Sequence, residues 1–254
     1  MKRSVLMVSI GLLSVLACWG GDDAPARGPV KAVMVPQGPK IDGTFSDEIW
    51  KKALTLALGD VTGPGKPALK TTARVLLDEK FLYVGFECEE PKTGTLKKDC
   101  TTADGPVWED DCVEIFVSAD PDKGYRHIAI NSANTVFDQA CAGDGNNDPA
   151  WNSKIESKVT IEENKCWRVT LAILLKDLDA YVGENLTWTF NLTRSRPARD
   201  ESPLEESSWA VLPTSRFHQP DAFARLNGVK VVERADGVTR KRDKPAAANQ
   251  EPAK

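Results

Sequence analysis

Short runs of alternating apolar and polar residues, separated by turn signals, are the feature that most constrains the fold of this chain. The clearest pair covers residues 71–78 and 81–89, joined by a tight Asp-Glu-Lys turn. In the second run, Leu82, Val84 and Phe86 share one face, as expected of a half-buried strand whose side chains alternate. The two runs therefore predict a β-hairpin.

Further runs of this kind follow along the chain, and helical patterns are few. They predict strands at residues 112–118, 125–132, 135–139, 155–162, 165–174, 186–194, 209–212 and 224–232. About ten short antiparallel strands indicate an all-β fold, a jelly-roll-like β-sandwich. One short N-terminal helix is expected at residues 46–53, with Ser46 as its cap and Trp50 facing inward. Trp167 and Trp188, at apolar positions of their strands, are also expected in the core.

The first residues have the features of an export signal. A basic start, Met1-Lys-Arg3, precedes an apolar run at 5–17 that is too short to span a membrane. The run ends Val-Leu-Ala-Cys18, which resembles a bacterial lipobox and implies cleavage before Cys18 and lipidation of that residue. An ordinary secretory peptide, cut near the same place, is the alternative.

This organisation divides the chain into four parts. We expect a signal peptide at residues 1–17, a lipid-anchored tether at 18–29, one β-sandwich at 30–233 and a disordered tail at 234–254. The mature protein is then expected at the bacterial cell envelope, periplasmic or on the cell surface, held to the membrane by its lipid. The net charge of −4 and the pI near 5.4 argue against a nucleic-acid partner, which usually requires a basic patch.

The cysteines fit an exported protein. Five remain after Cys18, at positions 88, 100, 112, 141 and 166. In an oxidising compartment one or two disulfides are expected, with one thiol left over. The sequence has no Cys-x-x-Cys pair, which disfavours a zinc site or a redox couple.

A possible calcium loop lies at Asp144, Asn146 and Asp148, which place oxygen donors at alternate positions. Pro149 stands where such a loop requires glycine, and Ile155 stands where it requires glutamate. Calcium is thus a candidate ligand here, and a solvated turn is the simpler interpretation.

The stretch 108–117 is the main candidate for function. Trp108 stands at the mouth of a predicted strand, and Glu114 follows on the strand face opposite the core. An aromatic ring can stack on the apolar C–H face of a sugar while a carboxylate accepts hydrogen bonds from its hydroxyl groups. The structural alternatives are that Trp108 plugs the end of the sandwich and that Glu114 pairs with Arg126 or Lys123.

Two polar residues of the next predicted strand lie, like Glu114, on the strand face opposite the core. His127 and Asn131 lie on the face opposite Ile128 and Ile130. If the two strands are neighbours in the sheet, one open surface collects these side chains together with Glu114. We expect all three to offer hydrogen bonds to a ligand.

Several separated pieces together resemble the family 9 carbohydrate-binding modules. The pieces are Ile41-Asp-Gly43 with Trp50-Lys-Lys-Ala53, the hairpin 73–86, the blocks 108–116, 167–178 and 188–194, and Ser208-Trp209. The match spans roughly residues 36–232, and the ordered set is more specific than any single piece.

The resemblance implies a β-sandwich that clamps a sugar between two tryptophans. Trp108 matches the first tryptophan, Glu114 the nearby carboxylate, and Trp209 corresponds to the second tryptophan. Asn191 and Arg194 lie in the block before it and are candidates for reaching the same sugar. The implied partner is a glycan of the glucan or xylan type, bound without catalysis. Any association with glycoside hydrolysis would come through partner proteins.

Catalysis by the chain itself is not expected. A glycosidase needs two carboxylates on separate elements, whereas the pairs Asp110-Asp111 and Glu205-Glu206 are neighbours in sequence. Two other functions stay open. Similar sandwiches bind haem b through a methionine and transfer electrons, for which Met34 is the remaining candidate ligand. Alternatively, the chain is a structural interaction module of the envelope.

Overall fold

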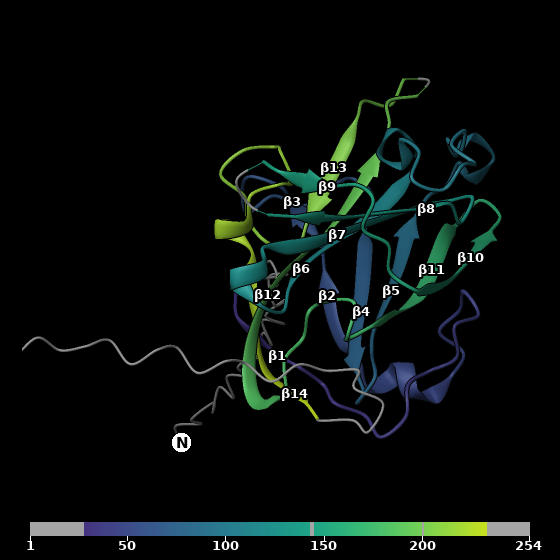
Figure 1. Ribbon diagram of the computed structural model, residues 1–254. Helices are drawn as coiled ribbons and strands as arrows, with labels where there is room; N and C mark the ends of the chain where they lie inside the picture. The colour runs from purple at the N-terminus through teal and green to yellow at the C-terminus, as the bar shows by residue number, and fades with distance from the viewer. Residues whose placement is uncertain (1–27, 143–144, 200, 233–254) are drawn as a thin grey trace, which may run out of the picture.

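The computed structural model describes residues 28–142, 145–199 and 201–232. Over these residues two β-sheets of fourteen strands in all pack face to face, and short 3₁₀ helices lie in the connections (Figure 1). This arrangement confirms the predicted all-β sandwich. Within the described ranges no helix is long and apolar enough to cross a membrane.

Some of the sequence-based predictions lie outside the described residues. They are the signal peptide, Cys18 with most of the tether, Asp144 of the calcium candidate, and the tail from 234 to 254. These stay predictions.

The larger sheet has nine strands. Neighbouring strands follow the order β1-β14-β12-β6-β7-β8-β9, and β13 pairs with both β12 and β3. Pairing is antiparallel except between β1 and β14. The strands are β1 (Val30–Lys31), β3 (Gly59–Asp60), β6 (Cys112–Ser118), β7 (Tyr125–Asn131), β8 (Val136–Cys141), β9 (Asn147–Asp148), β12 (Gly183–Arg196), β13 (Glu205–Ser208) and β14 (Ala224–Val231).

The smaller sheet is antiparallel throughout, in the order β10-β11-β5-β4-β2. Its strands are β2 (Leu54–Ala57), β4 (Thr71–Leu77), β5 (Phe81–Glu89), β10 (Ile155–Glu162) and β11 (Cys166–Leu174). The predicted hairpin is confirmed as β4 and β5. Asp78 sets its turn, because its carboxylate accepts hydrogen bonds from the backbone N–H groups of Lys80 and Phe81, both at 2.7 Å, as aspartate does in tight turns.

The expected N-terminal helix is a 3₁₀ helix, η1 (Glu48–Lys52). Its N-cap is Asp47 rather than Ser46, because the Asp47 carboxylate accepts a hydrogen bond from the Ile49 N–H at 3.1 Å. Trp50 faces inward and is buried, as predicted. The other 3₁₀ helices are η2 (Thr93–Thr95), η3 (Val107–Glu109), η4 (Pro121–Lys123) and η5 (Pro220–Ala222).

The inner faces of the two sheets form the main hydrophobic core. Trp167 on β11 and Trp188 on β12 are fully buried in it, as predicted. Met34, the candidate haem ligand, also packs against this core.

The predicted strand at 209–212 is wrong. The strand that pairs with β12 is β13, which ends just before it. Residues 209–212 are irregular, although the backbone N–H of Trp209 donates to the Leu192 carbonyl at 2.8 Å and that of Leu212 to the Val61 carbonyl at 2.7 Å. A strand and an irregular segment that docks on the sheet can carry the same apolar residues, so alternation alone does not separate them.

The predicted disulfides are also wrong, since all five cysteines in the described part of the chain are free thiols. The strand register explains one case. Cys88 on β5 lies opposite Trp167 on β11, so Cys166, one residue along, points to the other face of the sheet. Thiols on opposite faces of a sheet cannot meet the geometry of a disulfide.

Candidate functional site

Trp108 lies on η3, immediately before β6, and exposes 45% of its surface. Its neighbour Val107 is fully buried beside Cys112 and Phe137, which anchors the helix. The Trp108 ring contacts the Phe137 ring in an edge-to-face arrangement, with 5.0 Å between centroids. The indole is therefore supported on one side and open to solvent on the other, and it does not plug the sandwich.

The loop that presents Trp108 is held by two buried carboxylates. Asp110 accepts hydrogen bonds from the backbone N–H groups of Asp99 at 3.1 Å and Cys100 at 2.9 Å. Asp111 accepts from the Lys97 N–H at 2.8 Å and pairs with Arg199. Both carboxylates therefore stabilise the loop and are not available to a ligand.

Asn131 belongs to the same scaffold, so its predicted role as a ligand contact is wrong. It is completely buried at the end of β7. Its amide donates to the Cys100 carbonyl at 2.8 Å and to the Asp110 carboxylate at 2.9 Å. Its strand parity matches that of His127, but the loop at 97–100 covers this end of the sheet.

Glu114 and His127 do meet on one surface, as the sequence predicts. The Glu114 side chain is 3% exposed, and its Oε2 lies 2.6 Å from His127 Nε2. The expected alternative partner, Arg126, instead pairs with Asp179. His127 stacks flat on Phe116, with 4.5 Å between centroids and 4° between planes.

A hydrogen bond from Gln139 fixes which ring nitrogen of His127 carries a proton. Gln139 Nε2, which can only donate, lies 3.1 Å from His127 Nδ1. Nδ1 is therefore the acceptor, and Nε2 carries the hydrogen that is donated to Glu114. The other carboxylate oxygen, Oε1 of Glu114, has no hydrogen bond from any described residue and is available to a ligand.

These polar groups form a row across five strands of the larger sheet. Glu206 on β13 lies opposite Ser195 on β12, and Thr193 on β12 lies opposite Glu114 on β6. Beyond β6, Phe116 lies opposite His127, which in turn lies opposite Gln139 on β8. The row runs diagonally across the strands, with a step of two residues along β12 and another along β6, on the face turned away from the smaller sheet. Glu206, Ser195, Glu114, His127 and Gln139 all line one cavity.

A second wall comes from the segment 213–219. His218 Nδ1 lies 2.8 Å from the Tyr125 hydroxyl, and the His218 ring stands nearly perpendicular to that of His127, with 4.7 Å between centroids. Desolvation by the surrounding protein, together with the neighbouring His127, lowers the pKa of His218 to about 4 against an opposing effect of Glu114. More than a third of the side chain still contacts solvent, so a neutral imidazole is presented to the cavity near pH 7.

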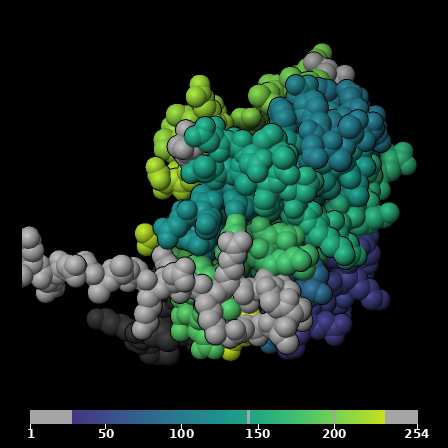
Figure 2. Space-filling view, in the orientation of Figure 1, coloured from purple at the N-terminus to yellow at the C-terminus, as the bar shows by residue number. Residues whose placement is uncertain are grey.

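The cavity between these walls has a volume of about 790 Å³, within the usual range of small-molecule sites. Figure 2 shows the molecule hollowed at its top, between a yellow-green lobe and the neighbouring green and blue ones. The residues that line the cavity are Trp108, Glu114, His127, Phe137, Gln139, Ser195, Leu204, Glu206, Ser215, Arg216, Phe217 and His218.

Glu206 is a carboxylate in this cavity that forms no hydrogen bond or ion pair through its side chain with the described residues. Partial burial raises the pKa of Glu206, and the nearby Glu114 raises it further. Its sequence neighbour Glu205 is used differently, because it accepts hydrogen bonds from the backbone N–H groups of Ala68 and Leu69.

Trp209 does not face the cavity, so the second stacking tryptophan predicted from the family resemblance is wrong. Its side chain is 2% exposed and packs in the main core. The chain turns inward after β13, and the backbone of Trp209 is tied to β12. Indole planes inside the core cannot contact a sugar.

Asn191 and Arg194 are structural as well, and their predicted sugar contacts are wrong. The Asn191 side chain bonds to Ser208 at 2.9 Å and accepts from the Ala210 N–H at 2.8 Å, and so docks the irregular segment on β12. Arg194 points between the sheets, where its guanidinium donates to the Thr71 hydroxyl at 3.2 Å and the Glu89 carbonyl at 3.0 Å.

The calcium candidate receives little support from its described part. Asp148 lies in the exposed strand β9, and its carboxylate accepts a hydrogen bond from the Ala150 N–H at 3.0 Å. Within residues 28–142, 145–199 and 201–232, no group of three or more His, Cys, Asp and Glu side chains is placed to hold a metal ion.

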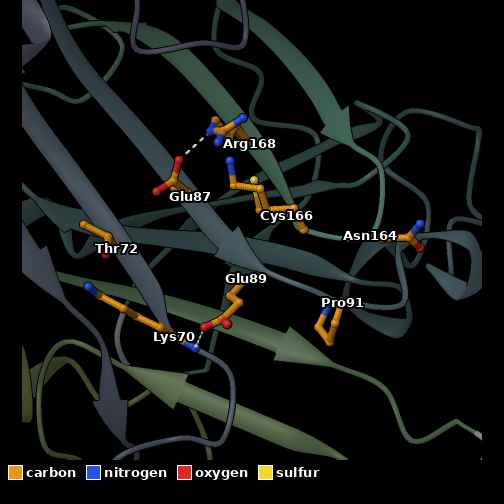
Figure 3. Close-up of a pocket in the computed structure, with 9 residues that line it drawn as sticks. Lys70, Thr72, Glu87, Glu89, Pro91, Asn164, Cys166 and Arg168 are labelled. Atoms are coloured by element: carbon orange, nitrogen blue, oxygen red, sulfur yellow. Dashed lines mark hydrogen bonds and ion pairs between the residues drawn. The ribbon is translucent and has the colours of Figure 1, made fainter.

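A second cavity, of about 310 Å³, lies on the smaller sheet (Figure 3). Arg168 pairs there with Glu87 at 2.5 Å, and Glu89 accepts a hydrogen bond from the Lys70 backbone at 3.2 Å (Figure 3). None of its lining residues is aromatic. This surface offers a sugar no stacking wall, and its carboxylates are open to solvent rather than buried.

Among the lining residues that sequence reasoning missed are Gln139, Glu206, Phe217 and His218. Gln139 could have been found, because it falls in a predicted strand next to that of His127. Glu206 lies on β13, just before the wrongly placed strand at 209–212, and Phe217 and His218 belong to an irregular segment that no periodic pattern marks.

The fold and the cavity define a β-sandwich with a polar, aromatic-walled cavity on its larger sheet. The chain matches the carbohydrate family 9 binding domain-like family over residues 41–229, more than half of its length. It therefore belongs to that family, which confirms the resemblance found in the sequence.

Individual relatives agree with this assignment. The fold is similar to a family 9 carbohydrate-binding module of Caldicellulosiruptor kristjanssonii in complex with cellotriose, with a TM-score of 0.58 and 18% identity over 87% of this chain and 100% of that one. A Bacteroides uniformis structure gives a TM-score of 0.64 at 18% identity, over 79% of this chain and 98% of that one. Endo-1,4-beta-xylanase C of Paenibacillus barcinonensis is 38% identical over 79 residues, which are 31% of this chain and 6% of the xylanase.

Proposed function

We propose that the cavity beside Trp108 binds a sugar without chemically changing it. The observation that carries the proposal is an open indole next to a buried carboxylate with one oxygen free, Glu114 Oε1. This oxygen reaches the surface of the cavity, where the O–H or N–H group of a ligand can donate to it in place of water. A pyranose supplies hydroxyl groups at its edge and an apolar C–H face for the ring.

The second wall of the proposed site is Phe217 with His218, in place of the expected Trp209. Both line the cavity from a segment far from Trp108 in sequence. One stacking contact contributes about 1 kcal/mol, and each charge-assisted hydrogen bond about 1.5–3 kcal/mol. With the cost of association, micromolar or weaker affinity is expected.

The ligand class we propose is a glucan- or xylan-type glycan. Solved family 9 modules from Caldicellulosiruptor kristjanssonii contain cellotriose and glucose, and the partial relative is a xylanase. Hydrolysis is not proposed, because Asp110, Asp111 and Glu205 are committed to backbone N–H groups.

The deciding experiment is affinity electrophoresis in gels that contain soluble glucan or xylan. Retardation of the wild type is expected, and Trp108→Ala should abolish it. Trp151→Ala is the matched control, since Trp151 is also partly exposed but lies outside the cavity, beside Arg126. Equal retardation of Trp108→Ala would remove that residue from the site, and a wild type that no glycan retards would contradict the function.

Export and lipid anchoring complete the proposal. They rest on the sequence of the first eighteen residues and would place the sugar site at the cell envelope. Labelling with a radioactive fatty acid in a bacterial host should mark the wild type and leave Cys18→Ser unlabelled. A labelled Cys18→Ser protein, or an unlabelled wild type, would contradict the anchor.

A further inference from the structure

Two carboxylates face the same cavity from different strands. Glu114 is on β6 and Glu206 on β13, with β12 between them. Two strand spacings and an offset of two residues along the strands separate their backbones by about 12 Å, a distance that one sugar ring and the two side chains can fill. The cavity thus presents acceptors on both sides of its polar row.

No Lys or Arg side chain in the described part of the chain forms an ion pair with either carboxylate. The partner of Glu114 is the N–H group of a His127 that keeps its other nitrogen as an acceptor. Glu206 has no ion pair with any residue in the described ranges. Arg216 is the one lining residue with a permanent positive charge, and it is exposed and forms no ion pair within the described part of the chain.

We propose that this cavity prefers a sugar bearing a protonated amine, an amino sugar, over the neutral sugar of the same shape. The inference rests on the proposed function and specifies its ligand. An ammonium group donates up to three N–H bonds, and its charge-assisted bonds to carboxylates are about twice as strong as those of neutral donors. The Trp108 face adds a cation–π attraction that a neutral hydroxyl does not receive.

The same charges exclude other classes of sugar. A uronic acid or a sulfated sugar would bring a third negative group beside Glu114 and Glu206, where like charges repel. An N-acetylated amino sugar has the same carbon skeleton as the free amine but is neutral. It therefore separates the contribution of charge from that of shape.

The test is isothermal titration of the folded chain near neutral pH with glucose, glucosamine and N-acetylglucosamine. Glucosamine should bind about tenfold more tightly than glucose, a difference of about 1.4 kcal/mol, and N-acetylglucosamine should show no such advantage. In Glu206→Gln, the ratio of the glucosamine and glucose affinities should fall close to one. Glu109→Gln is the charge-matched control, because Glu109 is exposed beside Trp108 but does not line the cavity, and its ratio should stay at the wild-type value.

The outcomes separate this inference from the proposed function. Binding of glucose with no preference for glucosamine overturns the inference and leaves the sugar site standing. An equal loss of preference in Glu109→Gln also overturns it, because overall charge would then explain the effect. If neither these monosaccharides nor the gel glycans bind, both proposals fail.

Discussion

Two cavities of this protein are lined by charged residues, yet they differ in how deeply those charges are buried. On the smaller sheet, Arg168 pairs with Glu87 and with Glu162, and the carboxylates of Glu87 and Glu89 are open to solvent. On the larger sheet, Glu114 is 3% exposed and keeps one oxygen without a protein donor, and Glu206 has no partner among the described residues. The number of charges is therefore a poor guide to a binding site, and a buried carboxylate that turns one oxygen to a cavity is a better one.

Aromatic support reinforces the contrast. Trp108, Phe137, Phe217 and His218 surround the carboxylates of the larger cavity. Apolar rings lower the local dielectric of a cavity, which strengthens hydrogen bonds to a bound ligand. The cavity on the smaller sheet has no such rings in its lining.

The largest expected effect is on folding stability, and it concerns Asp138, a buried carboxylate that does not line the cavity. Asp138 is buried on β8, next to Gln139 but on the opposite face. Burial raises the pKa of Asp138 to about 6, and repulsion from Asp104 and Asp177 adds to the rise against a hydrogen bond from the Ser153 N–H. Since its pKa is higher in the folded state, stability is greatest below about pH 4 and is lost as the pH rises to about 6.

Asp138→Asn should therefore stabilise the protein at pH 7 by up to about 3 kcal/mol, at about 1.4 kcal/mol per pKa unit. At pH 3.5 or so, below both pKa values, the two proteins should have similar unfolding free energies. Urea denaturation at several pH values measures the difference. A variant that is less stable than the wild type at pH 7 would show that the charged form of Asp138 is favoured in the fold.

At Glu114 the expected effect is on binding. Glu114→Gln keeps an acceptor for His127 but removes the charge that faces the ligand, and it should weaken glycan affinity by about 10–100-fold, equivalent to about 1.5–3 kcal/mol. Titration calorimetry measures the loss, with Glu156→Gln on the exposed face of β10 as the control. Wild-type affinity in Glu114→Gln would place the ligand elsewhere and remove the contrast between the cavities.

The sequence carries enough information for one side of the site. Alternation with a period of two puts Glu114 and His127 off the core, and pairing of β6 with β7 then brings them together. Trp108 is recognisable because it stands at the end of a strand in a polar segment. These inferences need only local periodicity and one assumption about neighbouring strands.

The other side depends on long-range contacts that periodicity does not encode. Arg194 occupies an inward position of β12 because the buried Glu90 lies there, with a nitrogen–oxygen distance of 3.8 Å, and a hydrophobicity pattern gives no sign of such a pair. Trp209 is buried because its segment docks on Asn191. Phe217 and His218 reach the cavity from an irregular segment, whose path depends on packing rather than on local preference.

The smallest effect on stability and binding is expected from a substitution in the cavity on the smaller sheet. This substitution checks the comparison between the two cavities most directly. Glu87 is 38% exposed and pairs with Arg168, and such partly exposed pairs contribute about 0–1 kcal/mol. Glu87→Gln should therefore change the unfolding free energy by less than about 1 kcal/mol and leave glycan retardation unaltered. If retardation weakened while the protein stayed folded, the paired charges of Figure 3 would belong to the binding surface, and burial of a carboxylate would no longer distinguish the two cavities.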